Sequence, residues 1–281
     1  MKIDERPLVT IGVPTFNRPE GLRRTLDRIT KQTYTNLEII VSDNCSPDER
    51  VEQIMREFVA SDCRIQYFRQ RQNKGASFNG RFVLRQASGR YFMWAADDDY
   101  FENSNLVEKL LEAARNHILA FPDVNQSADG QIIRSSLLQK VYGNCKDEYD
   151  YLLAWCDAGW GYPFYGLYNL REFEEHGLEF KFDDDLGYYN EGTFLHKVFL
   201  TGRIKFVPDI YINFDTQAQR PSNFLLIKSH ISYTKRLVLI HLRSKLEFRK
   251  KLRTLKILLR RHSKYEIGLL ISASKNFART S

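Results

Sequence analysis

Cysteine is scarce in this chain of 281 residues, and its four copies form no metal-binding pattern. Cys45, Cys63, Cys145 and Cys156 include no C-x-x-C pair, and their spacings match no zinc motif. This pattern is typical of reduced, structural thiols in a cytosolic protein. We therefore expect a cytoplasmic protein without structural zinc.

Long apolar runs and the common nucleotide-binding motifs are absent as well. No run of 18 apolar residues occurs, so no segment is expected to span a membrane. The first 13 residues place charges before a short apolar run but lack a small-residue cleavage site, which predicts the lead-in to a strand. Neither G-x-G-x-x-G nor G-x-x-x-x-G-K-[ST] occurs, which argues against a dinucleotide fold or a P-loop.

Positive charge is concentrated at the C-terminus. Residues 220–281 carry 16 Lys and Arg against two acids, whereas the preceding residues carry 26 against 33. Leu and Ile alternate with these basic residues, which predicts amphipathic helices. The basic face of residues 228–264 could attach to an anionic membrane surface, or the helices could only pack on the rest of the protein. Nucleic acid is not expected, because the remaining chain is acidic.

Strand-like and helix-like segments alternate through the first 115 residues, roughly every 25–30 residues. The predicted strands are 8–13, 37–41, 64–68 and 91–95, and the predicted helices are 19–31, 48–59, 77–86 and 105–115. This order predicts an α/β fold with a mostly parallel, Rossmann-like sheet and helices on both faces. The alternation stops after residue 121, where we expect only a helix at 190–201 and one or two short strands at 204–214.

The residues that follow the predicted strands are polar. These segments are Pro14–Arg18, Ser42–Ser46, Gln72–Gly75 and Asp97–Asp99. Ligands of such sheets bind at the carboxyl ends of the strands. Each segment alone could be a solvated turn, but four at one edge predict a binding site.

Three consecutive carboxylates, Asp97, Asp98 and Asp99, close an apolar strand. Like charges so close repel one another. A hard cation such as Mg²⁺ or Mn²⁺ would compensate this repulsion and would stabilise a phosphate leaving group. Asp43, after another strand, could accept hydrogen bonds from a base or a ribose.

Together these segments resemble the motifs of family 2 glycosyltransferases with the GT-A fold. Val9–Arg18 resembles the first strand and loop of that family, and Ile39–Ser46 resembles the second strand with its base-binding Asp. Asn73–Gly75, followed by Asn79, is similar to the third loop, and Ala96–Asp99 lies where the family has its D-x-D metal motif. Order and spacing agree over residues 8–106, and a weaker similarity continues to about residue 215.

The resemblance implies an inverting, metal-dependent enzyme of polysaccharide biosynthesis that moves a sugar from a nucleotide-diphospho-sugar to a glycan or lipid-linked saccharide. Arg81 is expected to replace a donor-binding Arg, because Phe78 occupies the position of that Arg in many members. Asp98, with Asp99 as second choice, would bind Mn²⁺ or Mg²⁺. The implied donor-binding residues are Pro14, Thr15, Phe16, Asn17, Arg18, Asp43, Lys74, Gly75, Asn79, Arg81 and Asp97.

Asn190–Lys197 resembles the E-D motif that opens a helix in this family, and Glu191 falls on the position of its general base. A second acidic triplet, Asp183–Asp185, is the alternative source of a base. We expect a catalytic domain over 1–219, with a nucleotide-sugar half at 1–121 and an acceptor half at 122–219. Residues 220–281 would form the basic helical tail.

Two other functions remain open at this point. Ala96 and Phe78 depart from the family pattern, which would suit a non-catalytic binding module tethered by its basic tail. A nucleotidyltransferase would also use metal-binding acids on an α/β sheet, but it would release pyrophosphate. The expected location is the cytoplasm, either free or peripheral on the inner face of the cytoplasmic membrane.

Overall fold

The computed structural model describes residues 6–128, 131–159, 161–181, 190–215 and 223–280. It divides into two compact units. The sheet unit contains residues up to 143 together with 162–177 and 205–217, and the helical unit contains 144–161, 178–204 and the residues from 218 onward. This division differs from a boundary at residue 219, because two earlier helices group with the C-terminal ones.

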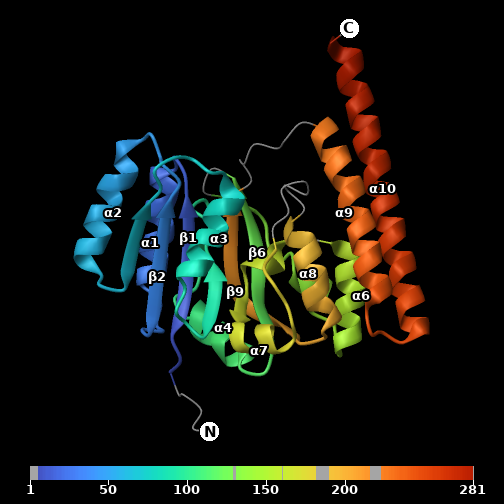
Figure 1. The fold of residues 1–281 in the computed structure, drawn as a ribbon, viewed down its shortest axis with the longest axis horizontal. Coiled ribbons are helices and arrows are strands. Elements are labelled where there is room, and N and C mark those ends of the chain that lie inside the picture. Colours follow the sequence, from blue (N-terminus) through green and yellow to red (C-terminus); the bar gives the residue numbers. More distant parts are fainter. Residues whose placement is uncertain (1–5, 129–130, 160, 182–189, 216–222, 281) are drawn as a thin grey trace. The chain divides into compact units, whose positions relative to one another are not determined.

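Four parallel strands form the N-terminal half of the sheet (Figure 1). Every residue of the second strand is buried, as expected for a strand that is covered on both faces. Pro14, where the sequence predicted a strand end, lies inside the first strand opposite Ser42. In the order β3-β2-β1-β4 the strands are β3 (Ile65–Arg69), β2 (Leu37–Asp43), β1 (Val9–Thr15) and β4 (Tyr91–Trp94).

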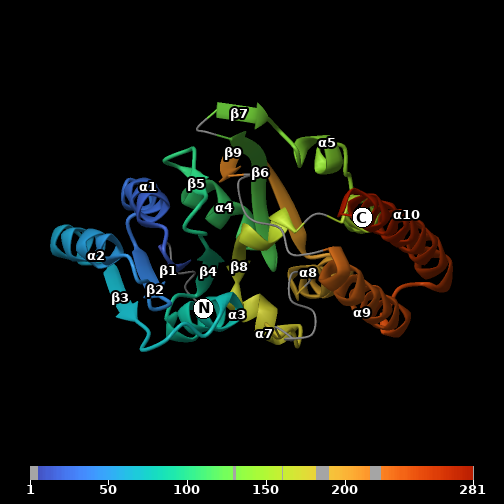
Figure 2. The same cartoon turned by 90° about the horizontal axis from the view of Figure 1, so that it is seen from above.

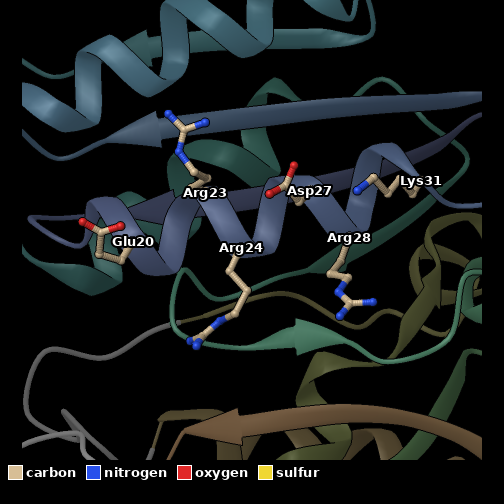
Figure 3. A pocket seen from close by; sticks show the side chains of 6 residues that line it. All are labelled: Glu20, Arg23, Arg24, Asp27, Arg28 and Lys31. Atoms are coloured by element: carbon tan, nitrogen blue, oxygen red, sulfur yellow. The ribbon is translucent and has the colours of Figure 1, made fainter. Parts of the chain in front are cut away.

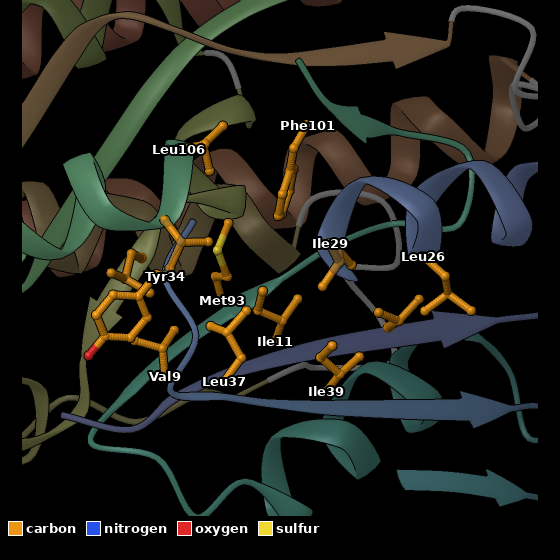
Figure 4. Close-up of a cluster of buried hydrophobic side chains, with 14 of the residues drawn as sticks. Val9, Ile11, Leu26, Ile29, Tyr34, Leu37, Ile39, Met93, Phe101 and Leu106 are labelled. Atoms are coloured by element: carbon orange, nitrogen blue, oxygen red, sulfur yellow. The ribbon is translucent and has the colours of Figure 1, made fainter. Parts of the chain in front are cut away.

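Helices cover both faces of these strands, with α1 and α3 on opposite sides (Figure 2). Leu22, Leu26 and Ile29 of α1 repeat at helical spacing and are buried in the core cluster that Figure 4 shows. On the other face, a Cβ at Gly12 would lie 2.7 Å from Val83, so glycine allows α3 to approach β1 closely. The helices are α1 (Pro19–Thr30), α2 (Glu49–Ser61), α3 (Ala76–Gln86) and α4 (Leu106–Ala114).

The remaining strands of the sheet pair in antiparallel fashion, so the α/β class is confirmed with a parallel part that ends at β4. Trp94 stacks on Phe164 with ring centroids 4.5 Å apart, which places part of the aromatic segment after residue 121 in the core. The strands are β5 (Tyr100–Phe101), β6 (Leu119–Ala128), β7 (Gln131–Arg134), β8 (Leu167–Asn169) and β9 (Ile204–Asp215), and short helices are α5 (Gln139–Tyr142), η1 (Tyr162–Tyr165) and α7 (Leu170–Glu175).

The helical unit consists of α6 (Glu148–Ala158), α8 (Asn190–Leu200), α9 (Asn223–Arg243) and α10 (Phe248–Thr280). The helix predicted at 190–201 is therefore confirmed. Trp155 of α6 is fully buried and stacks on Phe199 of α8, with ring centroids 4.9 Å apart. No helix in the described part of the chain is long and apolar enough to cross a membrane.

Candidate donor and catalytic site

The loop after β1 connects the neighbouring strand ends. Because β1 lies between β2 and β4, this loop borders the segments that follow both strands. Asn17, with a φ of 56°, donates its N–H to Oγ of Ser46 at 2.8 Å on the β2 side. Thr15 and Phe16 donate hydrogen bonds to Asp97 on the β4 side. Three of the predicted segments are therefore brought together.

The side chain of Asp97 is buried, and hydrogen-bond donors of this loop surround its carboxylate. Its Oδ2 accepts hydrogen bonds from Thr15 Oγ1 at 2.8 Å and from Phe16 N at 3.1 Å, and its Oδ1 accepts one from Arg18 at 3.0 Å. Burial raises the pKa of Asp97, and the charge of Arg18 opposes that effect. Arg18 also pairs with Asp98. Its guanidinium therefore compensates two neighbouring carboxylates.

Asp98 is the member of the acidic triplet that is best placed to bind a metal ion. Its side chain is 26% exposed, compared with 7% for Asp97, and Asp99 is buried. The described residues contain no cluster of three or more His, Cys, Asp or Glu side chains that could hold an ion. One partly exposed carboxylate fits Mg²⁺ or Mn²⁺ when phosphate oxygens and water supply the other ligands.

Asp43 is fully buried at the end of β2, and both of its carboxylate oxygens accept hydrogen bonds. Ser46 donates from N and Oγ to Oδ1 at 2.8 and 2.5 Å, and Tyr67 donates its hydroxyl to Oδ2 at 3.1 Å. Burial, and then the Asp43 charge, raises the pKa of Tyr67, which keeps this hydroxyl protonated. Arg69 Nε lies 3.6 Å from Oδ2. Sequence reasoning missed Tyr67 and Arg69, although the parallel register pairs Arg69 with Asp43.

The loop before α3 places its predicted residues in different surroundings. Lys74 is exposed, with Nζ 4.5 Å from the centroid of the Phe78 ring, and Gly75 has a φ of 82°. Asn79 is buried, and its amide donates to main-chain carbonyls at the ends of β1 and β2, at 3.2 and 2.8 Å. Asn79 therefore holds these strand ends together. Arg81 is partly buried further along α3.

Two residues of α1 that sequence reasoning missed fix the backbone of the acidic triplet. A Cβ at Gly21 would lie 2.1 Å from the carbonyl oxygen of Asp97, so only glycine allows this approach. Thr25 donates its hydroxyl to the carbonyl oxygens of Ala96, at 3.2 Å, and Asp99, at 2.5 Å. Neither residue belongs to a motif, because the contacts depend on how the helix packs against the loop.

An open hollow on the outer face of α1 lies beside this region (Figure 3). Arg24 donates from Nη2 to the carbonyl oxygen of Asp98 at 3.2 Å, and its guanidinium lies 5.1 Å from the centroid of the Tyr100 ring. Arg24 therefore supports the loop that carries the acidic triplet. The residues that line the hollow are Glu20, Arg23, Arg24, Asp27, Arg28 and Lys31.

Glu191, the predicted base, lies in the first turn of α8 in the helical unit. Its carboxylate is partly buried, and a Cβ at Gly161 would lie 3.1 Å from Oε2. Burial raises the pKa of Glu191 to about 7. A carboxylate with this pKa can accept a proton near neutral pH. The alternative bases, Asp183–Asp185, lie outside the described residues.

Comparison with known proteins gives a family match. The model of Glycosyl transferase family 2 matches residues 10–161, which is more than half of the chain. The chain is 30% identical over 212 residues to "Glycosyltransferase GlyA" of Streptococcus pneumoniae, covering 69% of this chain and 29% of that protein. It is also 30% identical to the Escherichia coli "UDP-Glc:alpha-D-GlcNAc-diphosphoundecaprenol beta-1,3-glucosyltransferase WfgD", covering 54% of this chain and 57% of that protein. The chain thus spans less than two thirds of both relatives.

A solved structure shows the same fold. The crystal structure of residues 1–349 of S. aureus TarS in complex with UDP superposes with a TM-score of 0.69 at 18% identity. The match covers 90% of this chain and 71% of TarS 1–349. It extends the similarity in fold beyond the region that the family model matches.

Proposed function

Because the chain belongs to glycosyl transferase family 2, we propose that it transfers a sugar, with inversion, from a nucleotide-diphospho-sugar to a hydroxyl of a glycan or lipid-linked saccharide. One observation carries this proposal: the loop after β1 links Asp97 on one side to Ser46 and Asp43 on the other. The UDP complex of TarS supports a uridine nucleotide as the first donor to test. The WfgD relative, named for a diphosphoundecaprenol acceptor, supports a lipid-linked acceptor.

In this proposal the strand ends of the sheet unit bind the donor. Asp43 is assigned to the base and Asp97 to the ribose, while Lys74 and Gly75 border the ribose or the phosphates. Arg18 forms ion pairs with Asp97 and Asp98. The remaining donor-binding residues are Pro14, Thr15, Phe16, Asn17, Asn79 and Arg81.

Asp98, with Asp99 as second choice, would hold a divalent cation, Mn²⁺ or Mg²⁺. When bound, such an ion neutralises the diphosphate of the donor and of the leaving nucleoside diphosphate. The hard oxygens of this partly exposed carboxylate support the assignment.

Glu191 is proposed as the general base. Its carboxylate takes the proton of the acceptor hydroxyl while the hydroxyl oxygen forms the new bond to the anomeric carbon. The bond from that carbon to the diphosphate oxygen breaks, and its electron pair leaves with the nucleoside diphosphate. The transition state has oxocarbenium-like character, as in glycoside hydrolysis. A carboxylate with a pKa near 7 suits this proton transfer.

Calorimetry with nucleoside diphosphates and Mn²⁺ tests the donor site. We expect UDP or another nucleoside diphosphate to bind in the presence of Mn²⁺, and Asp98→Ala to weaken that binding at least tenfold. Asp157→Ala, at an exposed acid of the helical unit, is the matched control and should bind as the native protein does. If no nucleotide binds, or if Asp98→Ala binds with native affinity in Mn²⁺, the assignment fails.

Glu191→Gln tests the chemistry and separates the alternatives. We expect nucleotide affinity to be kept and sugar transfer to fall by about 10²–10⁴-fold, the usual contribution of a general base. Unchanged transfer would remove Glu191 from the mechanism. A non-catalytic module would bind donor without releasing nucleoside diphosphate in either variant, and a nucleotidyltransferase would release pyrophosphate instead.

We also propose that the helical unit attaches to an anionic lipid surface. Phe248, Leu252 and Leu259 follow one side of α10 at helical spacing, and their exposed fractions are 75%, 58% and 42%. Such a stripe beside a basic face is typical of helices that lie in a membrane interface. The exposed basic residues of the same helix are Arg249, Lys250, Arg253, Lys256 and Arg260.

Sedimentation with vesicles tests this attachment. The protein should bind vesicles that contain about one third phosphatidylglycerol, with little binding to pure phosphatidylcholine. Phe248→Ser combined with Leu252→Ser should weaken binding at least tenfold. Ile132→Ser combined with Ile133→Ser removes two equally exposed apolar side chains from β7 and should have no effect. Equal binding by both double variants would contradict the proposal.

A further inference from the structure

Two glycines near the end of α6 each leave room for a different charged side chain. A Cβ at Gly159 would lie 2.1 Å from Nη1 of Arg261, and a Cβ at Gly161 would lie 3.1 Å from Oε2 of Glu191. Gly159 also has a φ of 61°, which favours glycine for a second reason. Gly161 therefore packs against the candidate base, and Gly159 packs against an arginine of α10.

Arg261 binds the C-terminal end of α6. Its Nη1 donates to the carbonyl oxygens of Trp155 and Cys156 at 2.9 and 3.0 Å. The Trp155 carbonyl also accepts from the N–H of Gly159 at 2.9 Å, so the guanidinium is a second donor to it, and a cation is favoured at this end of a helix. One guanidinium thus fixes the end of α6 and packs on Gly159.

The other side of Arg261 fixes two rings of the same unit. Its Nη2 lies 2.6 Å from Nε2 of His262, so His262 accepts there and carries its proton on Nδ1. His262 Nδ1 can then donate to His230 Nε2, 3.0 Å away. Arg261 is also hydrogen-bonded to the hydroxyl of Tyr233, which is buried. The arginine therefore sets the positions of side chains on α9.

Tyr233 in turn touches the residue next to the candidate base. A Cβ at Gly192 would lie 2.3 Å from the hydroxyl oxygen of Tyr233, so the tyrosine packs directly on the first turn of α8. Glu191 is consequently bordered by Gly161 at its carboxylate and by the Tyr233–Gly192 contact at its backbone. Arg261 is hydrogen-bonded to the tyrosine of the second border, and it packs on Gly159, two residues before the glycine of the first.

We propose that Arg261 is a positioning residue for Glu191, acting through the end of α6 and Gly159 on one side and through Tyr233 and Gly192 on the other. The proposal rests on the proposed function because it takes Glu191 as the general base. It goes further because it gives a residue of α10 a part in positioning that base. The arginine itself touches neither donor nor acceptor in this assignment.

Arg261→Gln removes the fork of donors, and Lys146→Gln, at an exposed basic residue of the helical unit, is the matched control. We expect Arg261→Gln to lower kcat at least tenfold, with nucleotide affinity within twofold of native. The midpoint of its pH–rate profile should fall from about 7 toward the ordinary value of a glutamate, because the displaced carboxylate becomes hydrated. Lys146→Gln should keep the native kcat and midpoint. If Arg261→Gln matches Lys146→Gln in both, the proposal is overturned.

The pKa of the Glu191 carboxyl can be measured by ¹³C NMR, which does not depend on catalysis. The carboxyl signal is identified as the one that is lost in Glu191→Gln. A lower carboxyl pKa in Arg261→Gln than in the native protein supports positioning even if Glu191 proves not to be the base. An unchanged carboxyl pKa overturns it. Should Arg261→Gln fail to fold, Tyr233→Phe and Gly161→Ala test the two sides separately. Native kcat and native carboxyl pKa in both variants would also overturn the proposal.

Discussion

Arg18 shows at the scale of single residues how the acidic triplet is tolerated before any ligand binds. Its guanidinium pairs with both Asp97 and Asp98, and the hydroxyl of Thr15 adds a neutral donor to Asp97. Charge-assisted hydrogen bonds of this kind are about twice as strong as neutral ones. A cation that binds Asp98 would share that carboxylate with Arg18.

Gly21→Ala should damage the donor site without removing any polar group. The added methyl would lie 2.1 Å from the carbonyl oxygen of Asp97, so α1 or the loop must shift. We expect a loss of about 1–3 kcal/mol in the free energy of unfolding and weaker nucleotide binding. Gly80→Ala, also in a helix, meets nothing closer than 3.9 Å and should be neutral or stabilising. Urea unfolding and calorimetry distinguish the two, and equal stability of both variants would contradict the packing argument.

The protonation state of Glu191 predicts how turnover depends on pH. Because burial raises its pKa to about 7, the carboxylate that accepts a proton is formed only as the pH rises through that value. We expect kcat at saturating donor to increase about tenfold per pH unit below 6 and to level off above 8. Stopped-assay rates between pH 5.5 and 9 measure this. A flat profile, or one with its midpoint near 4.5, would mean that another group acts as the base.

At the scale of elements, the first half of the sheet could be predicted and the second half could not. The strands β1 to β4 alternate with helices whose apolar residues repeat at helical spacing, and both signals are local. The strand-end positions of Asp43 and Asp97 follow from that order alone. The short strands β8 and β5 pair with distant partners, and their two or three residues carry no periodicity. Contacts such as Gly21 with Asp97 arise only from tertiary packing.

Gly12→Ala should reveal how tightly α3 packs on β1. The new methyl would lie 2.7 Å from Val83 and 2.9 Å from Phe92, which costs about 1–3 kcal/mol of stability by overpacking. Val83→Ala alone leaves a cavity, but combined with Gly12→Ala it removes the nearest atom that the added methyl would meet. The double variant should therefore lose less free energy of unfolding than the sum of the losses of the two single variants. Urea midpoints of the four proteins measure this coupling, and strict additivity would contradict it.

At the scale of the whole molecule, the two units differ in how they use histidine. His117 and His176 lie in the sheet unit, where His117 is partly buried and His176 is exposed. In the helical unit His196, His230, His241 and His262 are all buried. His196 accepts a hydrogen bond from Trp155 Nε1 at 3.2 Å and lies 3.3 Å from His241. The scattered positions of these histidines in the sequence gave no sign of this clustering, because four different helices bring the rings and Trp155 together.

Acid should therefore loosen the helical unit before the sheet unit. Burial lowers the pKa of His196 to about 3 and of His230 to about 4, against about 6.5 when unfolded. The unfolded state then binds more protons, so stability is complete above pH 6.5 and is lost as the pH falls, on the order of 2 kcal/mol per histidine at pH 5. Hydrogen exchange at pH 7.5 and 5.0, corrected for intrinsic rates, should show α8 and α9 losing protection while β1 and β2 keep it. His262→Gln should reduce that difference and His176→Gln should not. Equal loss in both units would contradict this prediction.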